Sequence, residues 1–251
     1  MSLKPFEGKT ILVTGASSGI GLGLCQRLDE LGARLVLSVR NESDVKNIRE
    51  RTQDPGHRAV LSDMGSPDSI EAAAAQIKTQ SINLDGVAFC AGIHMLRPLT
   101  TMKSTHWLDA FSVNAIGPAH YLKCLVQNKS LSRSASIIFV SSIAALKAEP
   151  GASAYSASKG ALLSLTRSFA AELASQRVRV NCVSPGVVDT RMSRTMFERM
   201  SPEAMLGLKQ RHLLGTGTVD DVVSPMIFLM SDAAKWITGQ NLVVDGGFSI
   251  T

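Results

Sequence analysis

The chain has 251 residues, of which 45% are hydrophobic and 19% are charged, a balance that supplies an apolar core and excludes a disordered, collagenous or repeat protein. Its formal net charge of +5 is spread along the sequence and only 5% of the residues are aromatic, which argues against nucleic-acid binding. Because residues 1–9 are polar and no run of about 18 apolar residues occurs, we expect no secretory signal, no membrane span and a cytoplasmic protein.

Short apolar runs rich in β-branched residues predict seven strands, at 11–14, 35–39, 59–61, 86–90, 136–140, 178–183 and 242–244. The segments between them predict helices at 22–31, 42–51, 69–79, 105–128, 154–175 and 219–230. Strands that are apolar throughout are typical of burial on both faces, and strand–helix alternation indicates right-handed crossovers. We therefore predict an α/β protein: one doubly wound domain over residues 1–251, with a seven-stranded parallel sheet flanked by helices.

Residues 14–21 read Thr-Gly-Ala-Ser-Ser-Gly-Ile-Gly, between the first predicted strand and the first predicted helix. Glycines permit a tight turn close to a pyrophosphate, and the helix N-terminus adds partial positive charge. The spacing is not G-x-G-x-x-G, and no Lys-Ser or Lys-Thr follows the second glycine, which excludes a P-loop. The turn predicts an NAD(P)-binding Rossmann domain, with cofactor contacts from Gly15, Ser17, Ser18, Gly19, Ile20 and Gly21.

The end of the second predicted strand bears on the choice of cofactor. NAD-binding domains usually carry an acidic residue there to hold the ribose 2′-hydroxyl, but here Val39 occupies that place and Arg40 follows. A guanidinium can bind a 2′-phosphate through paired hydrogen bonds. The sequence therefore favours NADP(H) over NAD(H), with a solvated strand-end arginine as the alternative.

A second motif lies in the middle of the chain, where Ser142 is followed thirteen positions later by Tyr155 and then by Lys159. Together with the glycine turn, this motif resembles the single-domain short-chain dehydrogenases/reductases, and in particular their 3-oxoacyl-carrier-protein reductase-like members. The resemblance covers residues 8–248. It implies that the catalytic residues are Asn114, Ser142, Tyr155 and Lys159. It also implies cofactor contacts from Asp63, Met64, Ala91, Gly92, Tyr155, Lys159, Pro185, Gly186, Val188 and Thr190.

Tyr155 and Lys159 suit carbonyl–alcohol chemistry because residues four apart share one face of a helix. A nearby ammonium would lower the pKa of the tyrosine from its usual value of about 10, and a positive nicotinamide ring would add to this effect. Tyr155 would then donate a proton to a carbonyl oxygen or remove one from an alcohol, while Ser142 holds that oxygen. By the same resemblance, Asn114 would hold a water molecule that links Lys159 to solvent.

Two positions depart from the family pattern and leave the function open. Cys90 stands where an asparagine is common, which puts the local wall of the cofactor site in doubt. Ala171 stands where reductases that dock an acidic carrier protein tend to have arginine, which weakens that alternative. The substrate remains a small ketone, a 3-oxoacyl thioester or a more polar carbonyl compound. A non-catalytic dinucleotide sensor on the same fold is the other alternative.

By the same resemblance, residues 190–215 form a lid over the substrate. Its methionines are Met192, Met196, Met200 and Met205, and its basic residues are Arg191, Arg194, Arg199, Lys209 and Arg211. The lid is either amphipathic, with solvated arginines, or it recognises a substrate with an apolar body and an anionic group. Residues 94–96 either line the same pocket or form a plain loop. The resemblance also suggests a homo-oligomer, a tetramer or dimer, built through two long helices and the last strand.

The cysteines and histidines give no support to a metal site. Cys25, Cys90, Cys124 and Cys182 are widely spaced, with no C-x-x-C pair, and the five histidines form no H-x-x-x-H. We expect free, buried thiols and no bound metal.

Overall fold

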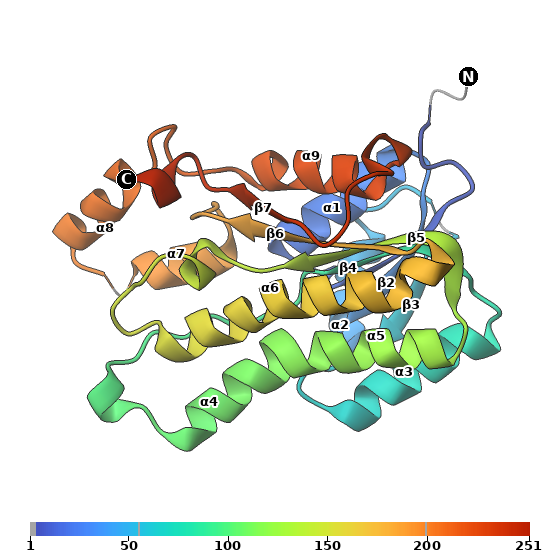
Figure 1. The fold of residues 1–251 in the computed structure, drawn as a ribbon, viewed down its shortest axis with the longest axis horizontal. Helices are drawn as coiled ribbons and strands as arrows, with labels where there is room; N and C mark the ends of the chain where they lie inside the picture. The colour runs from blue at the N-terminus through green and yellow to red at the C-terminus, as the bar shows by residue number, and fades with distance from the viewer. Residues whose placement is uncertain (1–3, 55, 199) are drawn as a thin grey trace.

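Seven parallel strands form one sheet in the order β3-β2-β1-β4-β5-β6-β7 (Figure 1). The computed structural model describes residues 4–54, 56–198 and 200–251. The strands are β1 (Thr10–Thr14), β2 (Arg34–Val39), β3 (Arg58–Leu61), β4 (Leu84–Phe89), β5 (Leu131–Val140), β6 (Arg179–Pro185) and β7 (Asn241–Val244). This arrangement confirms the predicted doubly wound α/β fold with a seven-stranded parallel sheet.

Helices cover both faces of the sheet. On one face lie α3 (Pro67–Thr79), α5 (Gly117–Gln127) and α6 (Ser153–Leu173), and on the other lie α1 (Gly19–Glu30), α2 (Glu42–Arg49) and α9 (Val219–Met230) (Figure 1). Alternate residues of β1 enter the two cores, Leu12 the first and Val13 the second, because successive strand side chains point to opposite faces. Short 3₁₀ segments are η1 (Leu99–Thr101), η3 (Ile143–Ala145), η4 (Ala174–Gln176), η5 (Asp232–Ala234) and η6 (Phe248–Ile250).

The predicted helix over 105–128 is not regular throughout. The structure has α4 (Ser104–Phe111), a π-helical segment η2 (Ser112–Ile116) and then α5. The widened turn contains Asn114, whose carboxamide accepts from the backbone N–H of Ile93 at 2.8 Å and donates to its carbonyl at 3.0 Å. A π-helical turn inside an α-helix frequently marks a functional site. Hydrophobic periodicity does not reveal it, because the apolar face continues through the segment.

The segment after β6 contains two helices that the sequence analysis left without secondary structure, α7 (Arg191–Phe197) and α8 (Pro202–Gln210). Thr190 caps the first, because its hydroxyl accepts from the backbone N–H of Ser193 at 3.3 Å. Ser201 caps the second in the same way, through the N–H of Ala204 at 3.2 Å. Within the described residues, no helix combines the length and apolarity needed to cross a membrane.

Candidate active site

The expected site residues come together at the carboxyl ends of four neighbouring strands. Gly15 follows β1, Gly92 follows β4, Ser142 follows β5 and Gly186 follows β6. The chain goes outwards from β1 to β2 and β3 before it returns to β4 on the other side of β1. Open α/β sheets bind ligands at the crevice that such a reversal leaves, so the topology explains why these loops share a site.

The glycine turn is pressed against the loop that follows β4. Gly15 has a φ of +65°, and a Cβ added to it would lie 2.9 Å from the backbone of Ala91. The hydroxyl of Thr14 accepts hydrogen bonds from the backbone N–H groups of Cys90 at 3.1 Å and Ala91 at 3.2 Å. These bonds join the two loops without an asparagine amide, so Cys90 leaves this part of the wall intact.

The start of α1 has the features of an anion site. Ser18 at its N-cap is extended, and no side chain of the described residues caps the free N–H groups of the first turn. The N–H of Ala16 donates to the carbonyl of Ser38 at 3.4 Å, which places the turn beside the end of β2. Arg40, two residues further on, is exposed and forms no ion pair or hydrogen bond with the described residues. The free N–H groups of this turn fit the pyrophosphate of a nicotinamide dinucleotide.

Two further expected cofactor contacts lie after β3. Asp63 is exposed, and its carboxylate accepts from the backbone N–H of Gly65 at 2.9 Å. Met64 is buried against the α3 and α5 side of the sheet. The backbone N–H of Asp63 donates to the Ser69 hydroxyl at 2.9 Å, and this bond holds the turn that the two residues form.

Two of the four residues expected to be catalytic, Asn114 and Lys159, lie beside Gly92. Tyr155 and Lys159 lie in the first two turns of α6, and both are buried. Asn114 is buried on η2. A Cβ added to Gly92 would lie 3.0 Å from Oδ1 of Asn114 and 3.1 Å from Nζ of Lys159. The lysine donates to the carbonyl of Val140 at 2.8 Å. The absence of a side chain at Gly92 therefore allows these two groups to approach the end of β4.

Asn114 is fully engaged in hydrogen bonds to protein groups. Besides its two bonds with Ile93, its Nδ2 donates to the hydroxyl of Ser158 at 3.0 Å. Ser158 in turn donates to the carbonyl of Tyr155 at 2.7 Å. Asn114 thus connects the loop after β4 to the first turn of α6.

The pKa of Tyr155 is raised from its usual value. Burial is the largest cause, the hydrogen bond with Ser142 opposes it, and the negative charge of Glu149 adds to it. Burial also lowers the pKa of Lys159 to about 8. The expected lowering of the tyrosine's pKa by Lys159 is wrong for this structure, because burial of the phenol raises that pKa and Lys159 is not among the groups that shift it.

A cavity of about 150 Å³ lies in front of Tyr155. Its polar lining includes His94, Ser142 and Glu149, and its apolar lining includes Ile143, Val188, Met192 and Met196. The His94 ring meets the Tyr155 ring edge to face, with 4.7 Å between centroids. His94 therefore lines the pocket, which the sequence analysis left undecided. The sequence analysis did not predict Glu149 as a site residue, because a single acidic residue before a Pro-Gly pair belongs to no recognisable motif.

The basic residues of the lid that the structure describes do not line this cavity. Arg194 forms a two-bond ion pair with Asp189 at 2.8 and 3.1 Å. Lys209 and Arg211 lie over the rings of Phe197 and Phe248, at 5.3 and 4.1 Å. Arg191 is exposed, and Arg199 lies outside the described residues. Since none of the described four lines the cavity, the structure favours an amphipathic lid over an anion-binding one.

His212 holds the lid to the segment after β6 and was missed by the sequence analysis. It is 3% exposed, its Nε2 accepts from the N–H of Val187 at 3.0 Å, and its Nδ1 faces the carbonyl of Leu208 at 2.9 Å. These partners require the neutral ring with the proton on Nδ1. A Cβ added to Gly186 would lie 2.9 Å from Nε2, so this glycine permits the contact.

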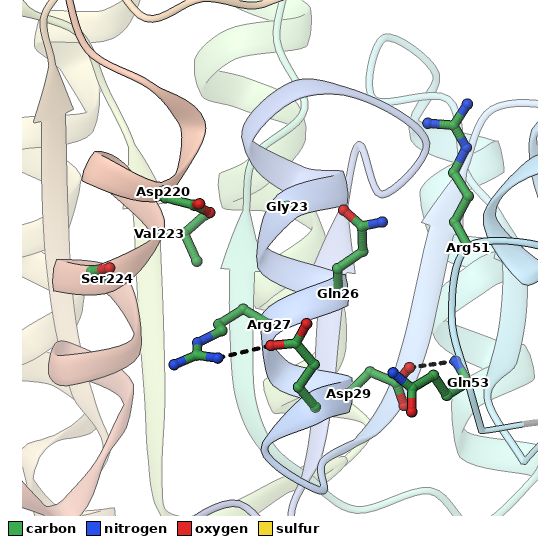
Figure 2. A pocket seen from close by; sticks show the side chains of 10 residues that line it. Gly23, Gln26, Arg27, Asp29, Arg51, Gln53, Asp220, Val223 and Ser224 are labelled. Carbon is green, nitrogen blue, oxygen red and sulfur yellow. Dashed lines mark hydrogen bonds and ion pairs between the residues drawn. The ribbon is translucent and has the colours of Figure 1, made fainter.

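A second, larger hollow of about 480 Å³ lies along α1 beside α9 (Figure 2). Three of its charged side chains pair with protein groups: Arg27 binds Glu30 at 2.8 Å, and Asp29 accepts from the N–H of Gln53 and bonds the ring of His57. None of the expected site residues lines it.

One group of possible metal ligands occurs among the described residues, Glu71 on α3 with His120 and Cys124 on α5. Nε2 of His120 lies 3.1 Å from Glu71 and 3.7 Å from the sulfur of Cys124, and Glu71 is exposed. A surface hydrogen bond accounts for the contact. All four cysteines are free, and Cys90 is half-buried where full burial was expected.

Known proteins resemble the chain over nearly its whole length. A family profile described as enoyl-(acyl carrier protein) reductase matches residues 15–249. The 3-oxoacyl-(acyl-carrier-protein) reductase FabG of Salmonella typhimurium is 31% identical over 242 residues, 96% of this chain and 98% of that protein. The cyclopentanol dehydrogenase of a Comamonas strain is 34% identical over 246 residues, 96% of this chain and 97% of that protein.

Solved structures agree. A short-chain type dehydrogenase/reductase from Mycobacterium ulcerans matches with a TM-score of 0.87 and 30% identity, over 98% of this chain and 91% of that one. The angucycline C-6 ketoreductase LanV with bound NADP matches with a TM-score of 0.86 and 26% identity, over 98% of each chain.

The fold and these matches define an oxidoreductase that acts on CH–OH or C=O groups with a nicotinamide dinucleotide. The chain belongs to the short-chain dehydrogenase/reductase family. The substrates in the relatives' names differ from one another, so membership does not choose the substrate.

Proposed function

We propose that the protein is an NADP(H)-dependent oxidoreductase that interconverts a carbonyl compound and a secondary alcohol, with Tyr155 as the acid and base. The observation that carries this proposal is the buried Tyr155, which lines one cavity with Ser142 and lies one helical turn from Lys159, next to the glycine turn. Arg40, exposed at the end of β2, supports the preference for the phosphorylated cofactor.

The chain's own residues would hold the dinucleotide along the strand ends. The first turn of α1 would bind the pyrophosphate, and Arg40 would bind the 2′-phosphate. Asp63 would contact the adenine ring. Lys159 would hold the ribose next to the nicotinamide, and residues 185–190 its carboxamide. The nicotinamide, when bound, supplies or accepts the hydride. The bound NADP of LanV supports this assignment in a protein of the same fold.

The protonation state of Tyr155 is the one that carbonyl reduction requires. A phenol whose pKa lies above its usual value stays protonated at neutral pH, and only the protonated form can donate to the carbonyl oxygen. Ser142 would hold that oxygen by a second hydrogen bond. In the oxidative direction the same tyrosine must first lose its proton, which its burial opposes. The free protein therefore holds Tyr155 in the protonation state that reduction needs.

Titration with NADPH and NADH, followed by nicotinamide fluorescence, tests the cofactor assignment. We expect NADH to bind at least about tenfold more weakly, because a charge-assisted pair with Arg40 contributes about 1.5–3 kcal/mol. Arg40→Gln should remove most of the difference between the dissociation constants of NADPH and NADH. Arg34→Gln, at the exposed start of the same strand, is the matched control and should keep it. Equal binding of both cofactors by the unmodified protein would refute the NADP(H) preference.

Reduction of a 3-oxoacyl thioester is the second candidate, favoured by the similarity to FabG. Ala171, exposed on α6, provides no cation for an acidic carrier protein. We therefore expect similar turnover of a 3-oxoacyl group on the carrier and on free pantetheine. A kcat/KM at least about tenfold higher with the carrier would favour the reductase of fatty-acid synthesis instead.

A further inference from the structure

The carboxylate of Glu149 lies in the wall of the cavity in front of Tyr155. It is half-buried, and none of the residues that the structure describes donates a hydrogen bond to it. Burial raises the pKa of this carboxyl, and the charge of Arg211 opposes that effect. Removing a carboxylate from water without a hydrogen-bond donor is unfavourable, so a ligand that brings a donor would recover part of this cost.

The position of Glu149 is fixed by a turn. Its carbonyl accepts from the N–H of Ala152 at 3.1 Å, and Gly151 between them has a φ of +81°. The carbonyl of Gly151 accepts from the N–H of Arg97 at 2.8 Å. This bond ties the turn that carries Glu149 to the loop that carries His94, so both polar side chains are held at the cavity by joined segments of the backbone.

The charges around the cavity are unlike those of an anion site. Lys159 is the one basic side chain among its described lining residues, and it donates to the carbonyl of Val140. The four basic residues of the lid that the structure describes lie outside the lining, and Arg194 is paired with Asp189. A substrate that enters therefore meets one carboxylate, an imidazole and the apolar surface of Ile143, Met192 and Met196.

We propose that Glu149 is a substrate-binding residue that accepts a hydrogen bond from an ammonium or hydroxyl group of the carbonyl substrate, whose apolar part packs against α7. The inference rests on the proposed function, since Tyr155 marks where the reacting carbonyl lies. It names the substrate class as amino ketones and hydroxy ketones, and it excludes keto acids, whose carboxylate would face Glu149.

Four ring ketones of matched size test this assignment: 1-methyl-4-piperidone, 4-hydroxycyclohexanone, 4-methylcyclohexanone and 4-oxocyclohexanecarboxylate. Their dissociation constants are measured by calorimetry on the protein saturated with NADP⁺, and kcat and KM are measured with NADPH. We expect the piperidone to bind at least about tenfold more tightly than the methyl compound, the hydroxy compound to lie between them, and the carboxylate to bind most weakly.

Glu149→Gln keeps the shape of the side chain and removes its charge. The tenfold preference for the piperidone over the methyl compound should fall to about twofold or less, through KM rather than kcat, and the carboxylate should gain affinity. Glu203→Gln, an exposed carboxylate of α8 outside the cavity, is the control for a change in net charge and should leave the ranking as it is.

The outcomes separate this inference from the proposed function. If neither NADPH nor NADP⁺ binds, the proposed function fails and the inference fails with it. If the cofactor binds but the four ketones bind equally, the carboxylate binds best, or none binds, the assignment of Glu149 is overturned while the oxidoreductase proposal stands. If Glu149→Gln leaves the order of affinities for the four ketones unchanged, the assignment of Glu149 is overturned as well.

Discussion

At the scale of single residues, burial sets the acid–base properties of the site. Tyr155 and Lys159 are 8% and 5% exposed, and desolvation disfavours the charged form of each. The tyrosine therefore stays a neutral phenol, and the lysine loses its proton at a lower pH than usual. The phenol is therefore protonated at neutral pH, and only this form can donate a proton to a carbonyl oxygen.

Replacing Tyr155 with phenylalanine removes the proton donor and little else. We expect kcat for ketone reduction to fall by at least about a hundredfold, because general acid catalysis contributes that much or more. The dissociation constant for NADPH, measured by fluorescence, should change by less than about threefold. Tyr121→Phe, in the core away from the cavity, is the matched control. Full activity of the Tyr155 variant would exclude this tyrosine as the acid.

The rate of reduction should depend on the charge of Lys159. Its pKa of about 8 lies below the raised pKa of Tyr155, so the lysine loses its proton first as the pH increases. We expect kcat/KM for reduction to be constant below about pH 7 and to fall above about pH 8. Lys159→Arg keeps the charge at all these pH values and should move the fall upwards. A fall at the same pH in both proteins would assign it to another group.

At the scale of the elements, loops that follow the strands are fixed by side chains from distant parts of the chain. Asn114 on η2 binds the backbone of Ile93 after β4. Thr14 at the end of β1 binds the same loop two and three residues earlier. His212 binds the loop after β6 from the end of the lid. The cavity is therefore bounded by loops whose positions depend on tertiary hydrogen bonds.

His212→Leu should loosen the lid. It leaves the N–H of Val187 and the carbonyl of Leu208 without partners in a buried place, and we expect the free energy of unfolding to fall by about 2 kcal/mol. The urea midpoint measures this loss, and KM for ketones should rise. His212→Gln, which retains a donor and an acceptor, should recover part of both. An unchanged midpoint in the leucine variant would contradict the anchoring role.

At the scale of the whole molecule, the edge of the sheet at β7 presents apolar surface. Trp236, just before this strand, is 96% exposed, Phe228 on α9 is 43% exposed and Leu242 on β7 is 36% exposed. An exposed sheet edge beside large apolar side chains is typical of a surface that another chain covers. We propose that β7 and α9 form a contact of the homo-oligomer that the family resemblance suggests.

Trp236→Glu should weaken that contact, because a carboxylate cannot be desolvated there without a partner. We expect sedimentation equilibrium to show a homodimer or homotetramer for the unmodified protein and smaller species for the variant. Lys235→Glu, the exposed neighbour, is the control and should keep the larger assembly. A monomer in the unmodified protein at micromolar concentration would refute the proposed contact.

The sequence alone determined the fold class and the alternation of strands and helices along the chain. Strands buried on both faces are apolar throughout, and parallel strands are usually joined by helices. It located the glycine turn and Arg40, since turn chemistry is a local property, and the family resemblance added Ser142, Tyr155 and Lys159. It missed η2, the lid helices and His212. These depend on contacts between residues far apart in the chain, which local patterns do not encode.

Only the tertiary structure decided what faces the substrate. The sequence placed five basic residues and four methionines in the lid without distinguishing inside from outside. The fold turns Met192 and Met196 to the cavity, pairs Arg194 with Asp189, and brings Glu149 and His94 to the same wall. It also buries Tyr155 so deeply that desolvation, rather than Lys159, sets the direction of its pKa shift. Burial and charge at a site arise from the packing of distant segments, and so they appear only when the chain is folded.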